Sequence, residues 1–169
     1  MELEPIGIVR TEAFGKEVRA RGHSSEVVLS KDLTGALDGL DDFSHIFVIF
    51  WMHKIYEPKR RTIKVNPRGR RDLPLVGIFA TRTPYHPNPI GLTLVELLGV
   101  EDNVLTVLGL DAFDGTPVLD IKPFDHWDMV DNVQVPDWWK RLEKERSERG
   151  QTSLSGPAGR SKKQGTVEN

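Results

Sequence analysis

Short stretches of alternating or continuous apolar residues recur along the chain, and long helical periodicity is rare. Residues 44–51, SHIFVIFW, have the length and β-rich composition of a buried strand. Residues 92–100 and 104–110 flank Glu101-Asp102-Asn103, whose residue types favour a hairpin turn. Shorter stretches of the same kind predict further strands at residues 6–11, 26–29, 61–65, 75–81 and 117–122.

Only two stretches favour a helix. Residues 30–40 carry Leu33, Leu37 and Leu40 after Ser30, a residue type that caps helices, and residues 137–149 read DWWKRLEKERSER. Many short strands with few helices predict a mainly β fold, a closed or nearly closed antiparallel β-barrel, because closure removes exposed strand edges.

The last segment differs in composition from the rest. From residue 150 onward the chain is rich in Gly, Ser, Lys and Gln, so too little apolar surface is available to offset the entropy of ordering. A length of 169 residues fits one domain with a tail. We therefore predict a β-barrel domain over residues 1–140 and, over residues 141–169, a helix end followed by a flexible polar tail.

Composition removes several classes of protein. The chain contains 0 cysteines, which excludes disulfides, zinc–thiolate sites and cysteine nucleophiles. The longest apolar run, residues 46–52, is too short to cross a bilayer, and the acidic start MELEPIGIVR is unlike a signal peptide. We expect a cytoplasmic protein without a membrane span. No glycine fingerprint for dinucleotides, P-loop, zinc-protease motif or hydrolase elbow is present, and no metal site is predicted.

Positive charge is concentrated in one segment. The run KRRTIKVNPRGRR, residues 59–71, holds seven basic residues and no acid, although the whole chain has a net charge of −2. Such a field is typical of a surface that meets phosphates, and equally of a solvated basic loop.

The stretch RTPYHPNPIGL, residues 82–92, combines three prolines with Arg82, His86 and Asn88. Each proline fixes its own φ and holds the preceding residue extended, so the polar side chains sit on a stiff loop. Side chains held in place before a ligand arrives lose little entropy on binding. The alternative is a proline-rich connector between two strands.

Two further patches carry candidate chemistry. In DGTPVLDIKPF, residues 114–124, Asp114-Gly115 forms a turn dipeptide, and Asp120 and Lys122 lie two apart on one strand face, where they either face a ligand or form a surface ion pair. His53 and Lys54 follow the predicted strand at residues 44–51, and strand ends are common places for sites, although a lone histidine there is often a surface residue.

Taken together, these motifs closely resemble the TsaA-like family of tRNA (adenine-N6)-methyltransferases. The resemblance rests on FATRTPYHPNPIGL (79–92), DGTPVLDIKPF (114–124) and LDGLDDFSHIFVIFWMHK (37–54), and it covers residues 4–136. It implies methyl transfer from S-adenosylmethionine to N6 of threonylcarbamoyladenosine, next to the tRNA anticodon. It also implies a β-barrel that works as a homodimer and binds the donor without a Rossmann sheet.

The resemblance also assigns residues. Donor-binding positions correspond to Arg19, in the segment KEVRARGHSS that replaces the family's Pro-Arg-Gln stretch, and to His53, Lys54, Arg82, Leu92, Asp114, Gly115, Thr116 and Pro117. Arg21 is the alternative to Arg19. His86 stands where relatives often carry arginine.

The chemistry adds candidates for catalysis and RNA binding. The acceptor nitrogen is urea-like and weakly nucleophilic, so a group that takes its proton or stabilises the changing charge should help the transfer; Asp120, Lys122, His86 and Asn88 are candidates. Unpaired anticodon bases can be held by aromatic and arginine side chains. We expect RNA contacts at Arg60, Arg61, Arg70, Arg71 and Tyr85. Two alternatives remain: a methyltransferase acting on a small molecule, and a non-catalytic RNA-binding module.

Overall fold

The computed structural model describes residues 2–148. The chain divides into two compact units, Met1–Asp131 and Asn132–Asn169. The predicted boundary near residue 140 stays a prediction, and the predicted flexible tail lies outside the described residues.

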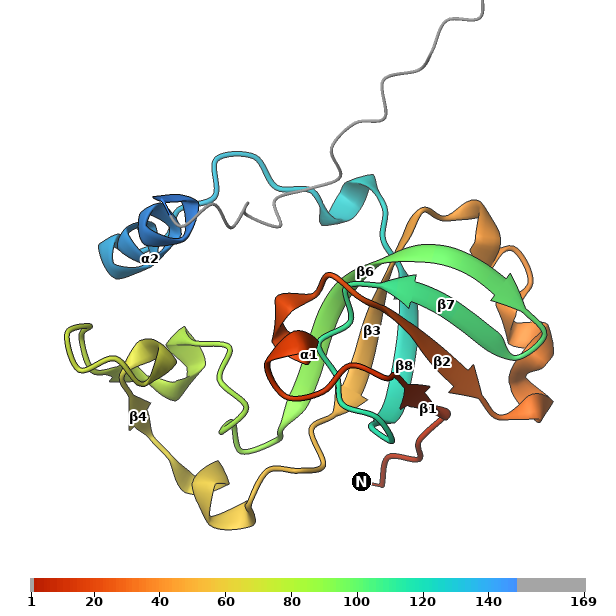
Figure 1. Ribbon diagram of the computed structural model, residues 1–169, viewed down its shortest axis with the longest axis horizontal. Helices are drawn as coiled ribbons and strands as arrows, with labels where there is room; N and C mark the ends of the chain where they lie inside the picture. Colours follow the sequence, from red (N-terminus) through yellow and green to blue (C-terminus); the bar gives the residue numbers. More distant parts are fainter. Residues whose placement is uncertain (1, 149–169) are drawn as a thin grey trace, which may run out of the picture. The chain divides into compact units, whose positions relative to one another are not determined.

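The first unit contains a closed antiparallel barrel of six strands (Figure 1). Around the barrel the order is β1-β2-β7-β6-β3-β8, and β1 pairs with β8 to close it. This confirms the predicted mainly β fold. The strands are β1 (Gly7–Arg10), β2 (Ser24–Leu29), β3 (His45–Trp51), β6 (Ile90–Glu101), β7 (Val104–Leu108) and β8 (Pro117–Pro123).

The barrel interior is filled by one side of each strand. In β3, Ile46, Val48 and Phe50 are buried while their neighbours lie on the outer face, as period-2 alternation requires. Gly91 of β6 is needed for close packing, because a Cβ there would lie 2.2 Å from the Phe50 ring. The same buried cluster includes Val9, Val27, Leu29, Val95, Leu105, Val107, Leu110 and Val118.

The predicted hairpin is present. Glu101 of β6 pairs with Val104 of β7, so Asp102 and Asn103 form the turn, and Asp102 adopts a positive φ of 51°. Aspartate and asparagine tolerate this conformation better than most residues. β7 ends at Leu108, two residues before the predicted end.

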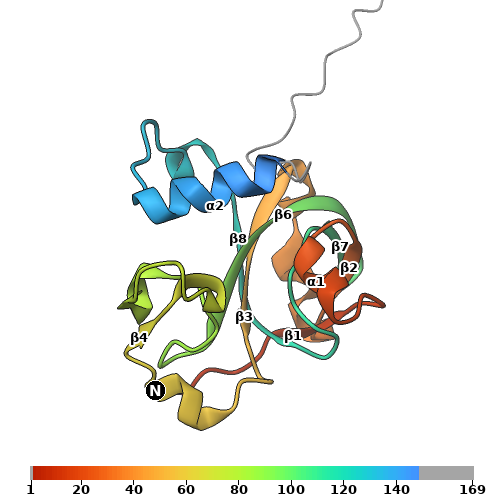
Figure 2. The same ribbon diagram turned by 60° about the vertical axis from the view of Figure 1, so that its left-hand side comes forward.

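A long insertion, residues 52–89, connects β3 to β6 beyond one end of the barrel (Figures 1 and 2). The strands predicted at residues 61–65 and 75–81 are wrong in extent, because only a two-stranded sheet of two-residue strands forms there. Basic residues, prolines and glycines leave this segment few apolar side chains to bury. Its elements are η3 (Glu57–Arg61), β4 (Lys64–Val65), η4 (Pro67–Gly69), β5 (Val76–Gly77) and η5 (Ile78–Ala80).

The predicted helix at residues 30–40 is also wrong. The segment forms the 3-10 helices η1 (Lys31–Leu37) and η2 (Leu40–Asp42), and the Ser30 side chain makes no capping hydrogen bond. Two glycines explain the short turns, since Gly35 weakens a helix and Gly39 adopts a φ of 80° that ends it. Conversely, α1 (Lys16–Ala20) was not predicted, because five residues with one buried side chain, Val18, carry no periodic signal.

After β8 the chain forms η6 (His126–Asp128), in which the Asp125 and Asp128 side chains make a capping box. In the second unit, α2 (Asp137–Glu148) confirms the predicted helix over its described part and carries an Arg141–Glu145 ion pair at 3.0 Å. Among residues 2–148, no helix combines the length and apolar character that crossing a bilayer requires.

Candidate active site

The antiparallel strand order brings the predicted site segments to one end of the barrel. β3 runs opposite to both β6 and β8, so the end of β3 lies beside the start of β6 and the start of β8. His53 and Lys54 follow β3, the proline loop precedes β6, and the Asp114–Pro117 turn leads into β8. Arg19 belongs to α1, which joins the neighbouring end of β1 to the start of β2. All the donor-binding candidates except Leu92, which lies within β6, are therefore in segments at this end.

Two contacts join the segments at this end. The Met52 amide donates to the Pro89 carbonyl at 2.8 Å, which links the exit of β3 to the proline loop. The Lys54 ammonium lies 4.7 Å from the centre of the Phe113 ring, directly before Asp114. The proline loop and the turn before β8 are thus both tied to the His53-Lys54 segment.

The turn before β8 is held against β1. The Thr11 amide donates to Asp114 Oδ1 at 3.1 Å, and the Gly115 amide donates to the Val9 carbonyl at 2.8 Å. Gly115 adopts a φ of 74°, which favours glycine. Thr116 is 2 % exposed, so it supports the turn from within and is not open to a ligand on the surface.

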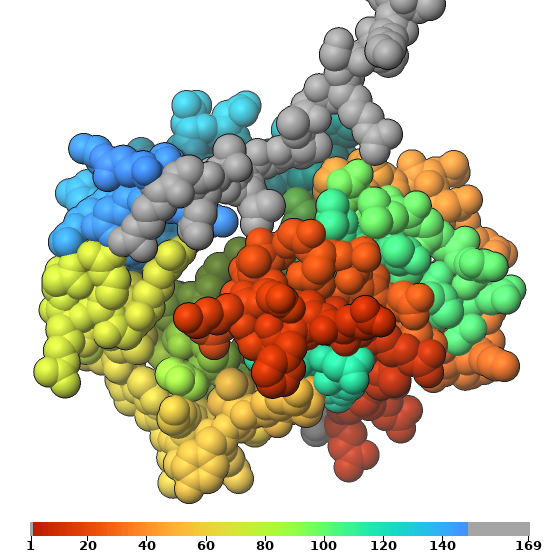
Figure 3. All heavy atoms as spheres, in the orientation of Figure 1, coloured from red at the N-terminus to blue at the C-terminus, as the bar shows by residue number. Residues whose placement is uncertain are grey.

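A hollow of about 1270 Å³ lies beside this turn and is lined by Asp114 and Gly115. The segment from Thr11 to Ser24 forms part of its wall, and Figure 3 shows this segment on the surface next to the turn before β8. Carboxylates dominate its charged lining, which comprises Arg10, Glu12, Glu17, Glu26 and Asp114. The other predicted donor contacts do not line it, so the structure does not gather them in one hollow: Arg19, His53, Lys54, Arg82, Leu92, Thr116 and Pro117.

The two arginines of the first segment differ in their surroundings. Arg21 donates from Nε to the Gly109 carbonyl at 2.8 Å and from a terminal nitrogen to the Leu94 carbonyl at 3.1 Å. It thereby satisfies backbone acceptors where β7 ends, and its role is structural. Arg19 is exposed in the last turn of α1, which leaves it as the candidate for a ligand contact.

A row of side chains crosses the outer face of three strands. Ile49 of β3 pairs with Leu92 of β6 on one side and with Asp120 of β8 on the other. Cross-strand partners project to the same face, so Leu92 and Asp120 flank Ile49. The row beside it joins Leu94, Phe47 and Lys122 in the same way. Leu92, Asp120 and Lys122 thus share the outer face of the sheet, with β3 between Leu92 and the Asp120–Lys122 pair.

Both oxygens of Asp120 already have partners. Oδ2 pairs with the Lys122 ammonium at 2.8 Å, and Oδ1 accepts the Ile121 amide at 2.9 Å. Both side chains are about half exposed, at 45 % and 62 %, so water and salt weaken this pair. Proton transfer to Asp120 would require one of these contacts to open.

The polar residues of the proline loop differ from one another in their surroundings. His86 Nε2 lies 2.9 Å from the Thr81 carbonyl, which can only accept, so Nε2 carries the hydrogen and Nδ1 of the neutral ring remains an acceptor. The His86 ring also packs edge-on against Phe79, with centroids 5.5 Å apart. Arg82 and Asn88 are exposed.

The pKa of His53 is lowered from its ordinary value of 6.5. Burial is the main cause, the charge of Lys54 adds to it, and a backbone hydrogen bond to Trp51 opposes it. This direction favours the neutral imidazole, which can accept a hydrogen bond at the end of β3.

The predicted RNA-binding arginines fall into two groups. Arg60 lies over the Trp51 ring, and Arg70 forms an ion pair with Asp72. Arg61 and Arg71 are exposed. The predicted RNA residue Tyr85 lies beside Lys59, whose ammonium is 5.0 Å from the ring centre.

Sequence reasoning did not single out Phe113, and it named Trp51 and Lys59 only as members of a strand and of the basic run. These residues form cation–aromatic contacts: Phe113 with Lys54, Trp51 with Arg60, and Lys59 with Tyr85. Phe113 stands directly before Asp114 and Trp51 two positions before His53, and this closeness in sequence was the available signal. Their pairing with cations depends on the fold.

The fold and the site define a class of protein, a ligand-binding β-barrel whose loops present cations, carboxylates and a proline loop at one end. Comparison with known proteins narrows this class to one family. The family described as the tRNA-methyltransferase O N-terminal domain matches residues 15–131. The chain belongs to this family.

Relatives of known name are similar over most of the chain. A protein from Methanothermobacter thermautotrophicus, described as a probable S-adenosyl-L-methionine-binding protein, is 42 % identical over 129 residues, which cover 73 % of this chain and 90 % of that protein. The tRNA (adenine(37)-N6)-methyltransferase of Escherichia coli is 36 % identical over 135 residues, covering 73 % of this chain and 57 % of that enzyme. A crystal structure of TrmO from Pseudomonas aeruginosa superposes with a TM-score of 0.63 at 27 % identity, covering 88 % of this chain and 73 % of that one.

Proposed function

We propose that this protein is a tRNA methyltransferase that transfers a methyl group from S-adenosylmethionine to N6 of threonylcarbamoyladenosine next to the anticodon. The family match over residues 15–131 carries the proposal. The gathering of the matched motifs at one end of the barrel supports it, because these segments are far apart in sequence.

The residues at this end fit the donor. S-adenosylmethionine combines a sulfonium and an ammonium with a carboxylate, so its site needs both signs of charge. Asp114 supplies a carboxylate with one oxygen fixed by Thr11, and Lys54 and Arg82 supply cations. The neutral His53 ring and the Gly115 backbone can add hydrogen bonds without charge. The remaining donor contacts of the proposal are Arg19, Leu92 and Pro117, with Thr116 supporting the turn from within.

The donor supplies an electrophilic methyl group on a positively charged sulfur. The protein must hold the acceptor nitrogen in line with that methyl and exclude water. The proline loop, anchored through Pro89 to the exit of β3, gives Arg82 and Asn88 fixed positions for this task. Asp120 can take the proton that the nitrogen loses once one of its contacts opens, whereas Lys122 and Asn88 can only stabilise the changing charge.

We also propose a homodimer. The outer side of β6 exposes apolar residues interrupted by Glu96, with exposures of 42 % for Ile90, 47 % for Leu92, 36 % for Leu94 and 50 % for Leu98. An apolar row on a strand face is typical of a protein interface. Leu98→Glu should shift the protein toward monomer in sedimentation velocity, and an unchanged sedimentation coefficient would contradict this interface.

We further propose a cytoplasmic location, which accords with a tRNA substrate.

The function is tested in two steps. Calorimetric titration with S-adenosylmethionine should give one binding isotherm, and mass analysis of nucleosides from treated tRNA should show methylated threonylcarbamoyladenosine. Donor binding without tRNA methylation would favour a small-molecule methyltransferase. Binding of tRNA without donor affinity would favour a non-catalytic RNA-binding module.

A further inference from the structure

Two aromatic rings at the site end of the barrel each lie under a cation from the same turn. The Lys59 ammonium lies 5.0 Å from the centre of the Tyr85 ring and 3.5 Å from its hydroxyl. The guanidinium carbon of Arg60 lies 5.3 Å from the Trp51 ring. Lys59 and Arg60 are adjacent in η3, whereas Tyr85 belongs to the proline loop and Trp51 ends β3.

These cation–aromatic contacts can be exchanged for contacts with a bound nucleotide. Neither ring is fully buried, and cation–π pairs at such partly exposed places are weak. Arg60 Nε is buried and has no hydrogen-bond partner among the described residues, so movement of Arg60 away from the Trp51 ring would let an acceptor satisfy this donor. A nucleotide supplies both partners at once, because its base stacks on a ring and its phosphate pairs with the displaced cation.

We propose that Trp51 and Tyr85 form a stacking site for two unpaired nucleobases of single-stranded RNA, with Lys59 and Arg60 taking the phosphates beside them. The inference rests on the proposed function and deepens it by naming the subsite that holds the anticodon loop. Base pairing in a duplex hides the faces that these rings require, so the site selects unpaired RNA. It joins the basic run, which supplies Lys59 and Arg60, to the proline loop, which supplies Tyr85.

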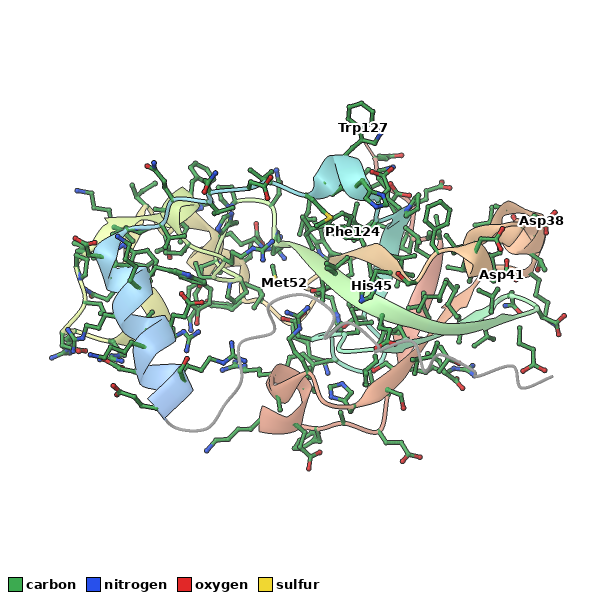
Figure 4. The ribbon with its side chains drawn as sticks, turned by 90° about the horizontal axis from the view of Figure 1, so that it is seen from above. Asp38, Asp41, His45, Met52, Phe124 and Trp127 are labelled. Carbon is green, nitrogen blue, oxygen red and sulfur yellow. The ribbon has the colours of Figure 1, made fainter. Side chains whose placement is uncertain are left out.

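The chain offers matched controls. Its second tyrosine, Tyr56, is 70 % exposed, and Trp127 is 95 % exposed and projects away from the barrel in Figure 4. Neither ring lies under a cation within the described part of the chain. Tyr85→Leu and Trp51→Leu are therefore compared with Tyr56→Leu and Trp127→Leu in the full-length protein.

The measurement is fluorescence anisotropy of a labelled, unstructured RNA oligonucleotide across a range of salt concentrations. Tyr85→Leu and Trp51→Leu should each weaken binding by roughly 5- to 150-fold with an unchanged salt slope, because a stacking contact releases no counterions. Lys59→Gln should instead flatten the slope of log affinity against log salt by about 0.7. Both control variants should bind like the parent, as should Tyr85→Phe, which keeps the ring.

Parental affinity in Tyr85→Leu would overturn the proposal, even if Trp51→Leu fails to fold. Equal loss in Tyr85→Leu and Tyr56→Leu would also overturn it. An acidic peptide or a duplex RNA that competes as well as the single strand would show a charge-selective surface and no base stacking. Donor titration and nucleoside analysis of the parent protein report on the proposed function separately, so failure of the stacking site leaves that result unaffected.

Discussion

The barrel and the insertion between β3 and β6 use their residues in opposite ways. In the barrel, alternate residues of each strand are buried, and its core includes Ile46, Val48 and Val107 at 0 % exposure. In the insertion, Leu73 and Ile78 are buried, but Ile63, Leu75 and Phe79 are exposed at 75 %, 60 % and 78 %, and turns and cation–aromatic contacts add to the ordering. Stability therefore resides in the barrel, and the insertion carries groups that bind.

The contrast has a functional reason. A ligand can be held only by groups that are not consumed by the core, and a loop fixed to a rigid scaffold supplies them. The Met52–Pro89 hydrogen bond and the Lys59–Tyr85 pair join distant parts of the insertion to each other, and the Arg60–Trp51 pair connects it to β3 of the barrel. Substitutions in the two regions should consequently separate loss of folding from loss of binding.

The largest effect is expected in the barrel. Ile46→Ala leaves a cavity among fully buried side chains and should lower the free energy of unfolding by about 2–5 kcal/mol. Ile63→Ala in the insertion is the matched control and should change it by less than about 0.5 kcal/mol. Urea denaturation of both variants provides the measurement. Similar losses in the two would show that the insertion is part of the cooperative core.

Loss of donor binding without loss of stability should follow Arg82→Ala. Removal of a charged hydrogen bond should weaken S-adenosylmethionine binding by about 1.5–3 kcal/mol in calorimetry, with an unchanged melting temperature. Asp114→Asn keeps an acceptor for the Thr11 amide while removing the charge, so it tests the barrel side of the site in the same way. Arg71→Ala is the control for a lost positive charge. Parental donor affinity in both site variants would refute the site assignment.

Salt dependence of RNA binding gives a smaller effect in the insertion. Arg61 and Arg71 are exposed, whereas Arg60 and Arg70 already lie against Trp51 and Asp72. Arg61→Ala combined with Arg71→Ala should flatten the slope of log affinity against log salt by about 1.4, or 0.7 for each phosphate contact. Donor affinity should not change. A parental slope would mean that the basic run is a solvated loop.

The smallest effect concerns pH. The pKa of His53 is lowered in the folded protein, mainly by burial, so as the pH falls below 6.5 the unfolded chain takes up the proton first. Stability present above pH 6.5 is thus lost on acidification through the folded pKa. His53→Gln should show a slightly smaller fall in melting temperature between pH 7 and pH 5. An equal or larger fall would argue against a lowered pKa.

The same division limits what the sequence reveals. The β3 and β6 strands were predictable because their burial is regular and their residues are β-branched or aromatic. The elements of the insertion were not predictable, because its 3-10 turns depend on local prolines and glycines. The apolar composition near Ile78 suggested a strand over residues 75–81, whereas Ile78–Ala80 form a 3-10 turn. Candidate site residues within one motif could be identified from the sequence. The alignment of Leu92, Ile49 and Asp120 in one row could not, because it depends on strand register between distant segments.

Closure of the barrel through β1 and β8 has a consequence for the folding rate. The Thr11–Asp114 contact joins residues 103 positions apart, and β1 pairs with β8 across a similar separation. Contacts between distant residues form slowly, because the entropy of closing the intervening loop must be overcome before they stabilise the chain. Folding in milliseconds to seconds is expected, and β1 lacks one of its two neighbours on the ribosome until β8 has been synthesised. The turn that carries Asp114 should therefore be among the last parts of the site to become ordered.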